Sequence, residues 1–135
     1  MPTPIPFQKK IKVENDVIDH FNHVNNLAYI KWVLEISKEH WDTITPKSVR
    51  DEYGWMIMKH ELVYKNQAKH NDKLIIKTWI DEYSTATCVR KTTILDAQTE
   101  ILFFESKAQW CYVNLNSRKP SRLPIDIVKP YFEDL

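Results

Sequence analysis

One segment limits what this chain can fold into more than any other: residues 27–41 carry the periodicity of a helix that is apolar over most of its circumference. The polar side chains of this segment fall in one narrow stripe, formed by Lys31, Glu35, Lys38 and Glu39. The remaining arc is filled by Tyr29, Ile30, Trp32, Val33, Leu34 and Ile36. A helix with so wide an apolar surface must be nearly surrounded by other elements to be stable in water.

Most of the remaining chain predicts β-strands. Residues 7–14 alternate loosely, and after a short helix or turn at 46–53 come four strand-like runs, at 55–64, 74–81, 85–95 and 102–112. The last run alternates apolar with polar side chains, which is typical of an antiparallel sheet that is wet on one face. In the first of the four, one face is expected to carry Met56, Met58, His60, Leu62 and Tyr64. A short helix, interrupted by Pro130, is expected within 123–132.

This order of elements predicts an α+β domain over residues 1–135, in which a curved antiparallel sheet of about five strands wraps around one long buried helix. No repeat, linker or low-complexity tract divides the chain. A single sheet of this kind leaves strand edges and aromatic side chains uncovered, so we expect a homodimer, or a homotetramer made by doubling it.

The composition excludes several functional classes. Gly54 is the only glycine, which rules out the glycine-rich phosphate loops of dinucleotide-binding and P-loop proteins. The formal net charge of +1 disfavours nucleic-acid binding. Cys88 and Cys111 have no metal-ligand spacing, so neither a metal nor another cofactor is expected. The first residues contain no apolar signal segment, and no stretch is long and apolar enough for membrane insertion, so a cytoplasmic protein is expected.

The residues that point to chemistry lie immediately before the helix. Residues 16–26, DVIDHFNHVNN, form a polar loop, and Asn25 or Asn26 is a natural helix N-cap. From Asp19 through Glu35 the sequence resembles the DxxxHVNNxxYxxWxLE signature of hotdog-fold acyl thioesterases. The resemblance covers the 4-hydroxybenzoyl-CoA thioesterase-like (4HBT-like) group and is especially close to plant-type acyl-carrier-protein (acyl-ACP) thioesterases.

The resemblance implies a hotdog fold and a hydrolase that cleaves an acyl-CoA or acyl-ACP thioester into a free acid and a thiol. Asp19 would be the catalytic carboxylate, acting as nucleophile or as general base. Backbone N–H groups around Val24, Asn25 and Asn26 would bind the substrate carbonyl as an oxyanion hole. The first N–H groups of a helix suit that role, because they have no partner within the helix and lie at the positive end of its dipole.

The chain departs from the plant-type pattern at two places. Phe21 stands where those enzymes have a second asparagine, and alignment of the later strand puts Gln67 at the position of a glutamate of their site. The same alignment puts Ala68 at a neighbouring cysteine position. The departures favour a small site, made of Asp19 and the helix terminus, in which His23 holds the substrate or Asp19 in place.

Other interpretations of these residues are structural. His20 and His23 lie close to two aspartates, but no further Cys or His completes a metal ligand set. His60, on an otherwise apolar strand face, is expected to be a core or interface histidine, or else to line the substrate pocket.

The same fold would also serve as a non-catalytic acyl-binding module or as a hydratase. The resemblance favours a fatty acyl group as the substrate, and hence a role in fatty acid metabolism. Each active site is expected to be built from two chains.

Overall fold

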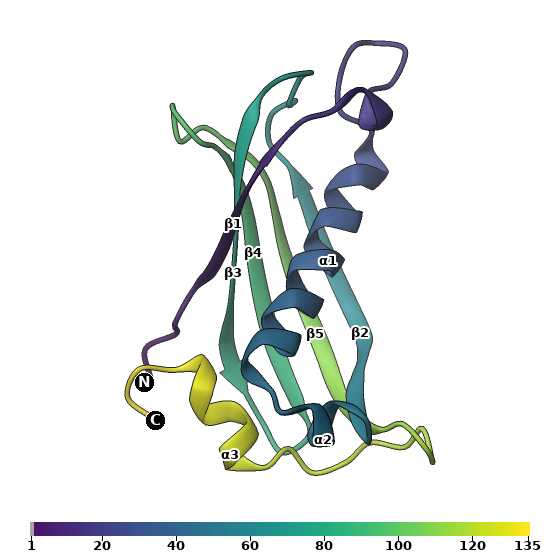
Figure 1. Ribbon diagram of the computed structural model, residues 1–135, viewed down its shortest axis with the longest axis vertical. Helices are drawn as coiled ribbons and strands as arrows, with labels where there is room; N and C mark the ends of the chain where they lie inside the picture. The colour runs from purple at the N-terminus through teal and green to yellow at the C-terminus, as the bar shows by residue number, and fades with distance from the viewer. Residues whose placement is uncertain (1) are drawn as a thin grey trace.

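The protein forms one curved five-stranded sheet packed against one long helix (Figure 1). The computed structural model describes residues 2–135, so Met1 of the expected domain lies outside the described residues. The strands are β1 (Phe7–Lys12), β2 (Tyr53–Tyr64), β3 (Lys73–Tyr83), β4 (Thr87–Asp96) and β5 (Leu102–Asn114). They follow the order β1-β3-β4-β5-β2, and every neighbouring pair is antiparallel. The expected α+β architecture is confirmed.

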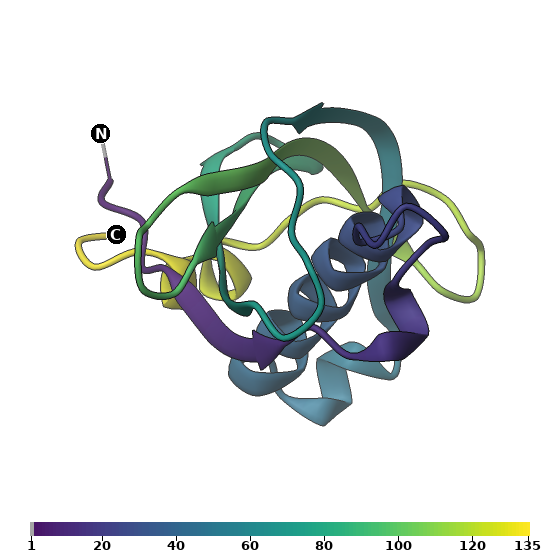
Figure 2. The ribbon, with the colours of Figure 1, turned by 90° about the horizontal axis from the view of Figure 1, so that it is seen from above.

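Helix α1 (Asn26–Ile44) lies across the concave face of the sheet. The sheet curves around one side of the helix (Figure 2). Asn25 caps the helix, because its side chain accepts a hydrogen bond from the Leu27 N–H at 2.9 Å. At the other end, the Thr45 N–H bonds the Trp41 carbonyl, and Pro46 follows. The helix thus begins and ends within a few residues of the expected bounds.

The apolar arc of α1 is covered on one side only. Tyr29, Val33 and Ile36 are buried against the sheet, whereas Leu27 is 70% exposed and Leu34 is 42% exposed. Leu27 and Leu34 lie seven residues apart, so they share one stripe of the helix. Within one chain, therefore, the helix is not nearly surrounded as its pattern predicts.

A β-bulge in β2 makes one sequence prediction wrong. Ile57 pairs with Trp110, but Lys59 pairs with Gln109, so Met58 is an extra residue without a partner on β5. One extra residue reverses which side chains face the helix, because the side-chain period of a strand is two. Before the bulge the helix-facing positions are therefore odd-numbered, including Trp55, and after it they are even-numbered. Met56, Met58 and His60 consequently do not share a face.

Two short helices and the C-terminal segment close one end of the sheet. Helix α2 (Lys47–Arg50) leads into β2, and α3 (Ile125–Val128) continues into a 3-10 turn, η2 (Lys129–Tyr131). The expected helix within 123–132 is therefore two short turns. Their apolar residues pack with Trp41, Ile80 and Tyr112 in a core cluster at the C-terminal end of α1. This segment does not reach the free edge of β2, which bonds β5 on its other side.

Candidate active site

The loop before α1 folds into a small hairpin that brings Asp19 next to His23. The Asp19 N–H donates to the His23 carbonyl at 2.8 Å, Ile18 and Val24 form an isolated antiparallel bridge, and the Asn25 N–H donates to the Val17 carbonyl at 2.7 Å. Asn22 stands at the tip with a φ of 62°, a left-handed conformation that asparagine tolerates better than most residues. The hairpin therefore folds Asp19 back onto His23, just before the start of the helix.

One oxygen of the Asp19 carboxylate is fixed by this hairpin. Asp19 Oδ1 accepts hydrogen bonds from the Phe21 N–H at 2.9 Å and from the His23 N–H at 3.1 Å. Among residues 2–135, no donor bonds the other oxygen, Oδ2. The arrangement is an Asx-type turn, which is also a common structural feature of loops. Here it leaves one carboxylate oxygen free beside a helix N-terminus.

The backbone N–H groups at the start of the helix differ in their availability. The Val24 N–H donates to the Ala68 carbonyl at 3.0 Å, and the Asn25 N–H is taken by Val17. The Leu27 N–H is capped by the Asn25 side chain. In the described part of the chain, the Asn26 N–H has no acceptor. Of the three groups expected to form an oxyanion hole, only that of Asn26 is therefore unoccupied.

The two candidate histidines lie in different places. His23 is half-buried in the hairpin and belongs to the same loop as Asp19. His60 is on β2, where its Nε2 lies 2.7 Å from the Ser106 Oγ, and burial lowers the pKa of its imidazole. Thus the structure brings Asp19, His23 and the start of α1 together, whereas His60 bonds a side chain of the sheet. Residues 2–135 contain no cluster of three or more potential metal ligands.

The β2–β3 loop supports the Asp19 hairpin from the side. Ala68 is fully buried, its carbonyl accepts the Val24 N–H, and its own N–H donates to the Tyr29 hydroxyl at 3.0 Å. The Tyr64 hydroxyl donates to the Asn26 carbonyl at 3.1 Å. Gln67 precedes Ala68, so the two positions aligned with plant-type site residues do lie alongside the hairpin.

A cavity of about 440 Å³ opens on the helix-facing side of the sheet, between the C-terminal half of α1 and β2. Aromatic side chains form much of its wall, and they are Trp41, Tyr53, Trp55 and Trp110. The guanidinium-bearing Arg90 and the thiol of Cys88 also line it. Leu34 contributes to the wall from the exposed stripe of the helix. This cavity is lined by no residue of the Asp19 hairpin of the same chain.

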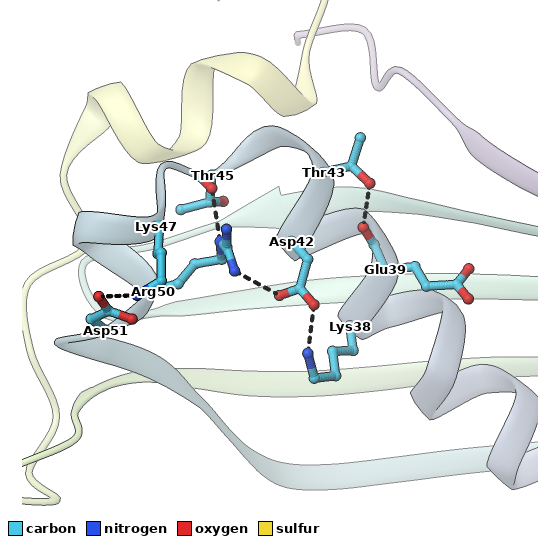
Figure 3. A network of polar contacts seen from close by, with 8 residues as sticks. All are labelled: Lys38, Glu39, Asp42, Thr43, Thr45, Lys47, Arg50 and Asp51. Carbon is cyan, nitrogen blue, oxygen red and sulfur yellow. Dashed lines mark hydrogen bonds and ion pairs between the residues drawn. The ribbon is translucent and has the colours of Figure 1, made fainter.

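Charged residues at the C-terminal end of α1 and on and just after α2 lie at one side of this cavity. Lys38, Asp42, Arg50 and Asp51 line it, Lys47 pairs with Asp51, and we call these five residues the mouth. Figure 3 shows the contacts among them. Asp42 bonds Lys38 at 2.5 Å and lies 3.8 Å from Arg50, and Lys47 bonds Asp51 at 2.8 Å. The Arg50 Nε also donates to the Thr45 carbonyl at 2.9 Å. Both carboxylates of the mouth are therefore paired with cations of the mouth.

Arg90 and the aromatic residues around it were not predicted as site residues from the sequence. Arg90 lies between Cys88 and Thr92 on the helix-facing side of β4, and the next residue, Lys91, is also a cation on the opposite face. Because both faces of the strand carry a positive charge at this point, alternation does not reveal which cation is buried. The only feature of the sequence that pointed to this cavity was its content of five Trp, six Tyr and five Phe, which predicts an apolar core, interface or pocket.

A family model described as the acyl-ACP thioesterase N-terminal domain matches residues 4–131. No curated protein matches the sequence. A hypothetical protein from Staphylococcus aureus, solved in complex with CoA, has 14% identity and a TM-score of 0.86, covering 98% of this chain and 87% of that one.

Two further solved structures are similar in fold. A 1,4-dihydroxy-2-naphthoyl-CoA thioesterase from Synechocystis has 15% identity and a TM-score of 0.78, covering 93% of this chain and 94% of that chain. A 12:0-ACP thioesterase from Umbellularia californica has 14% identity and a TM-score of 0.81, and the match covers 96% of this chain but 51% of that one. At these identities the likeness establishes the hotdog fold. No helix within residues 2–135 is both long and apolar enough to cross a membrane.

Proposed function

The chain belongs to the acyl-ACP thioesterase N-terminal domain family, and on that premise we propose that it hydrolyses an acyl thioester to a carboxylic acid and a free thiol, with Asp19 as the catalytic carboxylate. The observation that carries the proposal is the Asp19 hairpin itself. It holds one carboxylate oxygen on two backbone N–H groups, leaves the other oxygen free, and ends at an unoccupied helix N-terminal N–H group.

The chemistry follows from these three features. In the general-base route, Asp19 Oδ2 takes a proton from a water molecule, which attacks the thioester carbonyl. In the nucleophilic route, Oδ2 attacks the carbonyl directly, and water then hydrolyses the resulting anhydride. In both routes the carbonyl oxygen becomes negative, and the Asn26 N–H with the dipole of α1 stabilises it. The thiolate leaves and is protonated, so the products are one acid and one thiol.

His23 and His60 have different proposed roles. The backbone of His23 holds Asp19 through two hydrogen bonds, one in each direction, and its half-buried imidazole stands in the same hairpin. We assign His23 to positioning the carboxylate and the substrate. His60 is assigned to the subunit interface, because it lies on the edge strand β2 just after the bulge.

The functional unit is proposed to be a homodimer joined through β2. This edge strand carries exposed apolar side chains, namely Met56, Ile57, Met58, Val63 and Tyr64. Exposed apolar strand edges favour pairing with another chain, and an antiparallel partner extends the sheet without a gap. Such a dimer would also cover Leu27 and Leu34 on the open stripe of α1. A tetramer would form by packing two such dimers.

The dimer supplies a reason for the separation between Asp19 and the cavity. Antiparallel pairing of β2 with its copy puts the Tyr64 end of one strand beside the Tyr53 end of the other. The Tyr64 end is bonded to the start of α1, and the Tyr53 end lines the cavity. Each Asp19 would then stand near the cavity of the partner subunit, so the acyl group would bind in one protomer and be hydrolysed by the other.

Replacement of Asp19 by Ala tests the catalytic assignment. The variant is expected to lose orders of magnitude in kcat on acyl-CoA substrates, measured by thiol release, because it lacks the carboxylate proposed to act as base or nucleophile. Asp16→Ala is the matched control, since Asp16 is an exposed carboxylate in the same loop. Equal activity of the wild type and Asp19→Ala would refute the assignment.

The wild-type protein decides between hydrolysis and the alternative functions. A protein that binds acyl-CoA but releases no thiol from any acyl chain would be an acyl-binding module. The appearance of a hydrated acyl-CoA from an enoyl-CoA, without thiol release, would identify a hydratase. Side-by-side kcat/KM values on acyl-CoA and acyl-ACP substrates identify the carrier.

Complementation tests the shared site. Asp19→Ala and Cys88→Phe, which fills the cavity from β4 and away from the proposed interface, are each expected to be inactive as homodimers. In a shared-site heterodimer, both defects fall in one site and the other site is intact. Mixed subunits should therefore recover about a quarter of wild-type activity after random association. No recovery, or a fully active monomer in sedimentation, would contradict the shared site.

A further inference from the structure

The cavity beside β2 contains a buried positive charge without a counter-charge. The Arg90 side chain is 5% exposed, and its Nη1 lies 3.0 Å from His40 Nδ1 and 3.1 Å from the Thr78 hydroxyl. The guanidinium carbon stands 5.8 Å from the centre of the Tyr131 ring. Within residues 2–135, no carboxylate forms an ion pair with Arg90.

The groups around Arg90 are all neutral at physiological pH. Burial and the nearby guanidinium lower the pKa of His40 to about 3, so its imidazole is uncharged and accepts a hydrogen bond at Nδ1. Burial raises the pKa of Tyr131 to about 12 and that of Cys88 to about 12, so neither carries a negative charge. Asp42 and Asp51 are engaged by the lysines and the arginine of the mouth.

An unpaired buried cation is costly, and proteins normally pair such a group or bind an ion with it. A guanidinium has five N–H donors. Nη1 bonds His40 and Thr78, and the Tyr131 hydroxyl takes a further donor, so donors remain for a ligand. Trp110 adds a second unsatisfied group, because its indole Nε1 is buried without a hydrogen-bond partner and the residue lines the same cavity. Arg90 and Trp110 therefore bring N–H donors to the wall of the cavity, and such a wall suits a ligand that brings acceptor oxygens.

We propose that Arg90 recognises an anionic oxygen at the far end of the acyl group, so that the preferred substrate is a thioester whose acyl chain ends in a carboxylate. The aromatic walls of the cavity would hold the apolar middle of the chain, and the carboxylate would pair with Arg90 and accept the Trp110 N–H. This proposal rests on the proposed thioesterase function, of which it specifies the substrate class.

The charges at the mouth are compatible with an acid-bearing acyl group. Of the mouth residues that line the cavity, Lys38 and Arg50 carry two positive charges and Asp42 and Asp51 carry two negative charges, so their net charge is zero. An anionic chain end therefore meets no net repulsion as it enters. Inside, it exchanges its water shell for charge-assisted hydrogen bonds, which are stronger than bonds between neutral groups.

Matched pairs of CoA thioesters test the proposal. Hexanoyl-CoA and adipoyl-CoA have the same number of acyl carbons and differ in a terminal methyl or carboxylate group, and octanoyl-CoA and suberoyl-CoA form a longer pair. The wild type should prefer the carboxylated member at least about tenfold in kcat/KM. In Arg90→Met that preference should disappear or reverse. A wild-type preference for the methyl-ended members would overturn the proposal.

Two further variants make the result independent of folding. Lys91→Met removes the same charge from the neighbouring position on the opposite face of β4, where Lys91 pairs with Asp81 at 3.2 Å, and it should keep the wild-type ratio. Trp110→Phe keeps an aromatic ring but removes the N–H, and it should reduce the ratio several-fold. Because each ratio compares two substrates on one preparation, a loss of folded protein cancels. An unchanged ratio in both Arg90→Met and Trp110→Phe would overturn the proposal.

Binding of the free acids separates this proposal from the catalytic one. Hexanoate and octanoate, whose carboxylate can pair with Arg90, should bind the wild type at least about tenfold more tightly than the uncharged 1-hexanol and 1-octanol, and Arg90→Met should abolish the difference. This binding preference without any thioester hydrolysis would support the Arg90 assignment and refute the proposed catalysis. Hydrolysis without a preference for terminal carboxylates would support the catalysis and refute the Arg90 assignment.

Discussion

Acidification is expected to destabilise this protein through His40. This imidazole is 3% exposed, stacks on the Phe7 ring at 4.9 Å, meets the Tyr131 ring edge-on at 4.8 Å and accepts a hydrogen bond from Arg90. Protonation would place a second positive charge against the guanidinium. The pKa of His40 is accordingly lowered from 6.5 to about 3 in the folded protein.

The sign and size of the effect follow from linkage. The unfolded chain binds a proton at this histidine as the pH falls below about 6.5, whereas the folded protein does not until about pH 3. The stabilisation is therefore complete above pH 6.5 and is lost as the pH falls towards 3. The free energy of unfolding should drop by about 2 kcal/mol from pH 7.5 to pH 5, and by about 3 kcal/mol to pH 4.

Urea unfolding followed by tryptophan fluorescence measures this change. His40→Asn is the reference variant, because Asn offers an oxygen to Arg90 near the position of Nδ1 but does not titrate. The variant should be less stable at pH 7.5, since its smaller side chain leaves a gap, but its stability should fall about 2 kcal/mol less than that of the wild type on going to pH 5. Equal losses in the two proteins would refute the reasoning about His40.

The remaining predictions concern single contacts. Tyr29→Phe leaves the buried Ala68 N–H without an acceptor, so the free energy of unfolding should fall by about 1–3 kcal/mol in urea; a change below about 0.5 kcal/mol would contradict this. Gly54→Ala brings a Cβ within 2.9 Å of the Leu115 Cδ2. That atom ends a flexible, exposed side chain, so thermal unfolding should report a loss below about 1 kcal/mol, and a loss above about 2 kcal/mol would show that the backbone has to move. Burial raises the pKa of the Cys88 thiol to about 12, so it should resist a thiol reagent in the folded protein and react after unfolding; rapid reaction in the folded state would show that it is accessible.

Much of the fold was predictable because its determinants are local. The helix over residues 27–41 and the strand runs were expected from side-chain periodicity, and the observed elements extend them by a few residues at most ends. The polar loop that begins at Asp16 and its cap at Asn25 were likewise expected. These features follow from the conformational preferences of residues that are close together in the sequence.

The choice among the helix N-terminal N–H groups needed the tertiary structure. Val24, Asn25 and Asn26 were equivalent candidates in the sequence. A carbonyl from the distant β2–β3 loop, that of Ala68, occupies the Val24 N–H, and Val17 occupies that of Asn25. The occupation of the Val24 N–H thus depends on packing between segments more than forty residues apart, which no local pattern encodes.

The helix, the strands, the loop with Asp19 and the resemblance to thioesterases could all be recognised without coordinates, because each depends on residues adjacent in the chain. The bulge at Met58 and the burial of Arg90 instead of Lys91 became visible only in the folded chain. A bulge depends on the register against β5, and the cavity forms where α1, β2, β4 and β5 meet. Both are properties of long-range packing, because one inserted residue or one neighbouring strand reverses which side chains are enclosed.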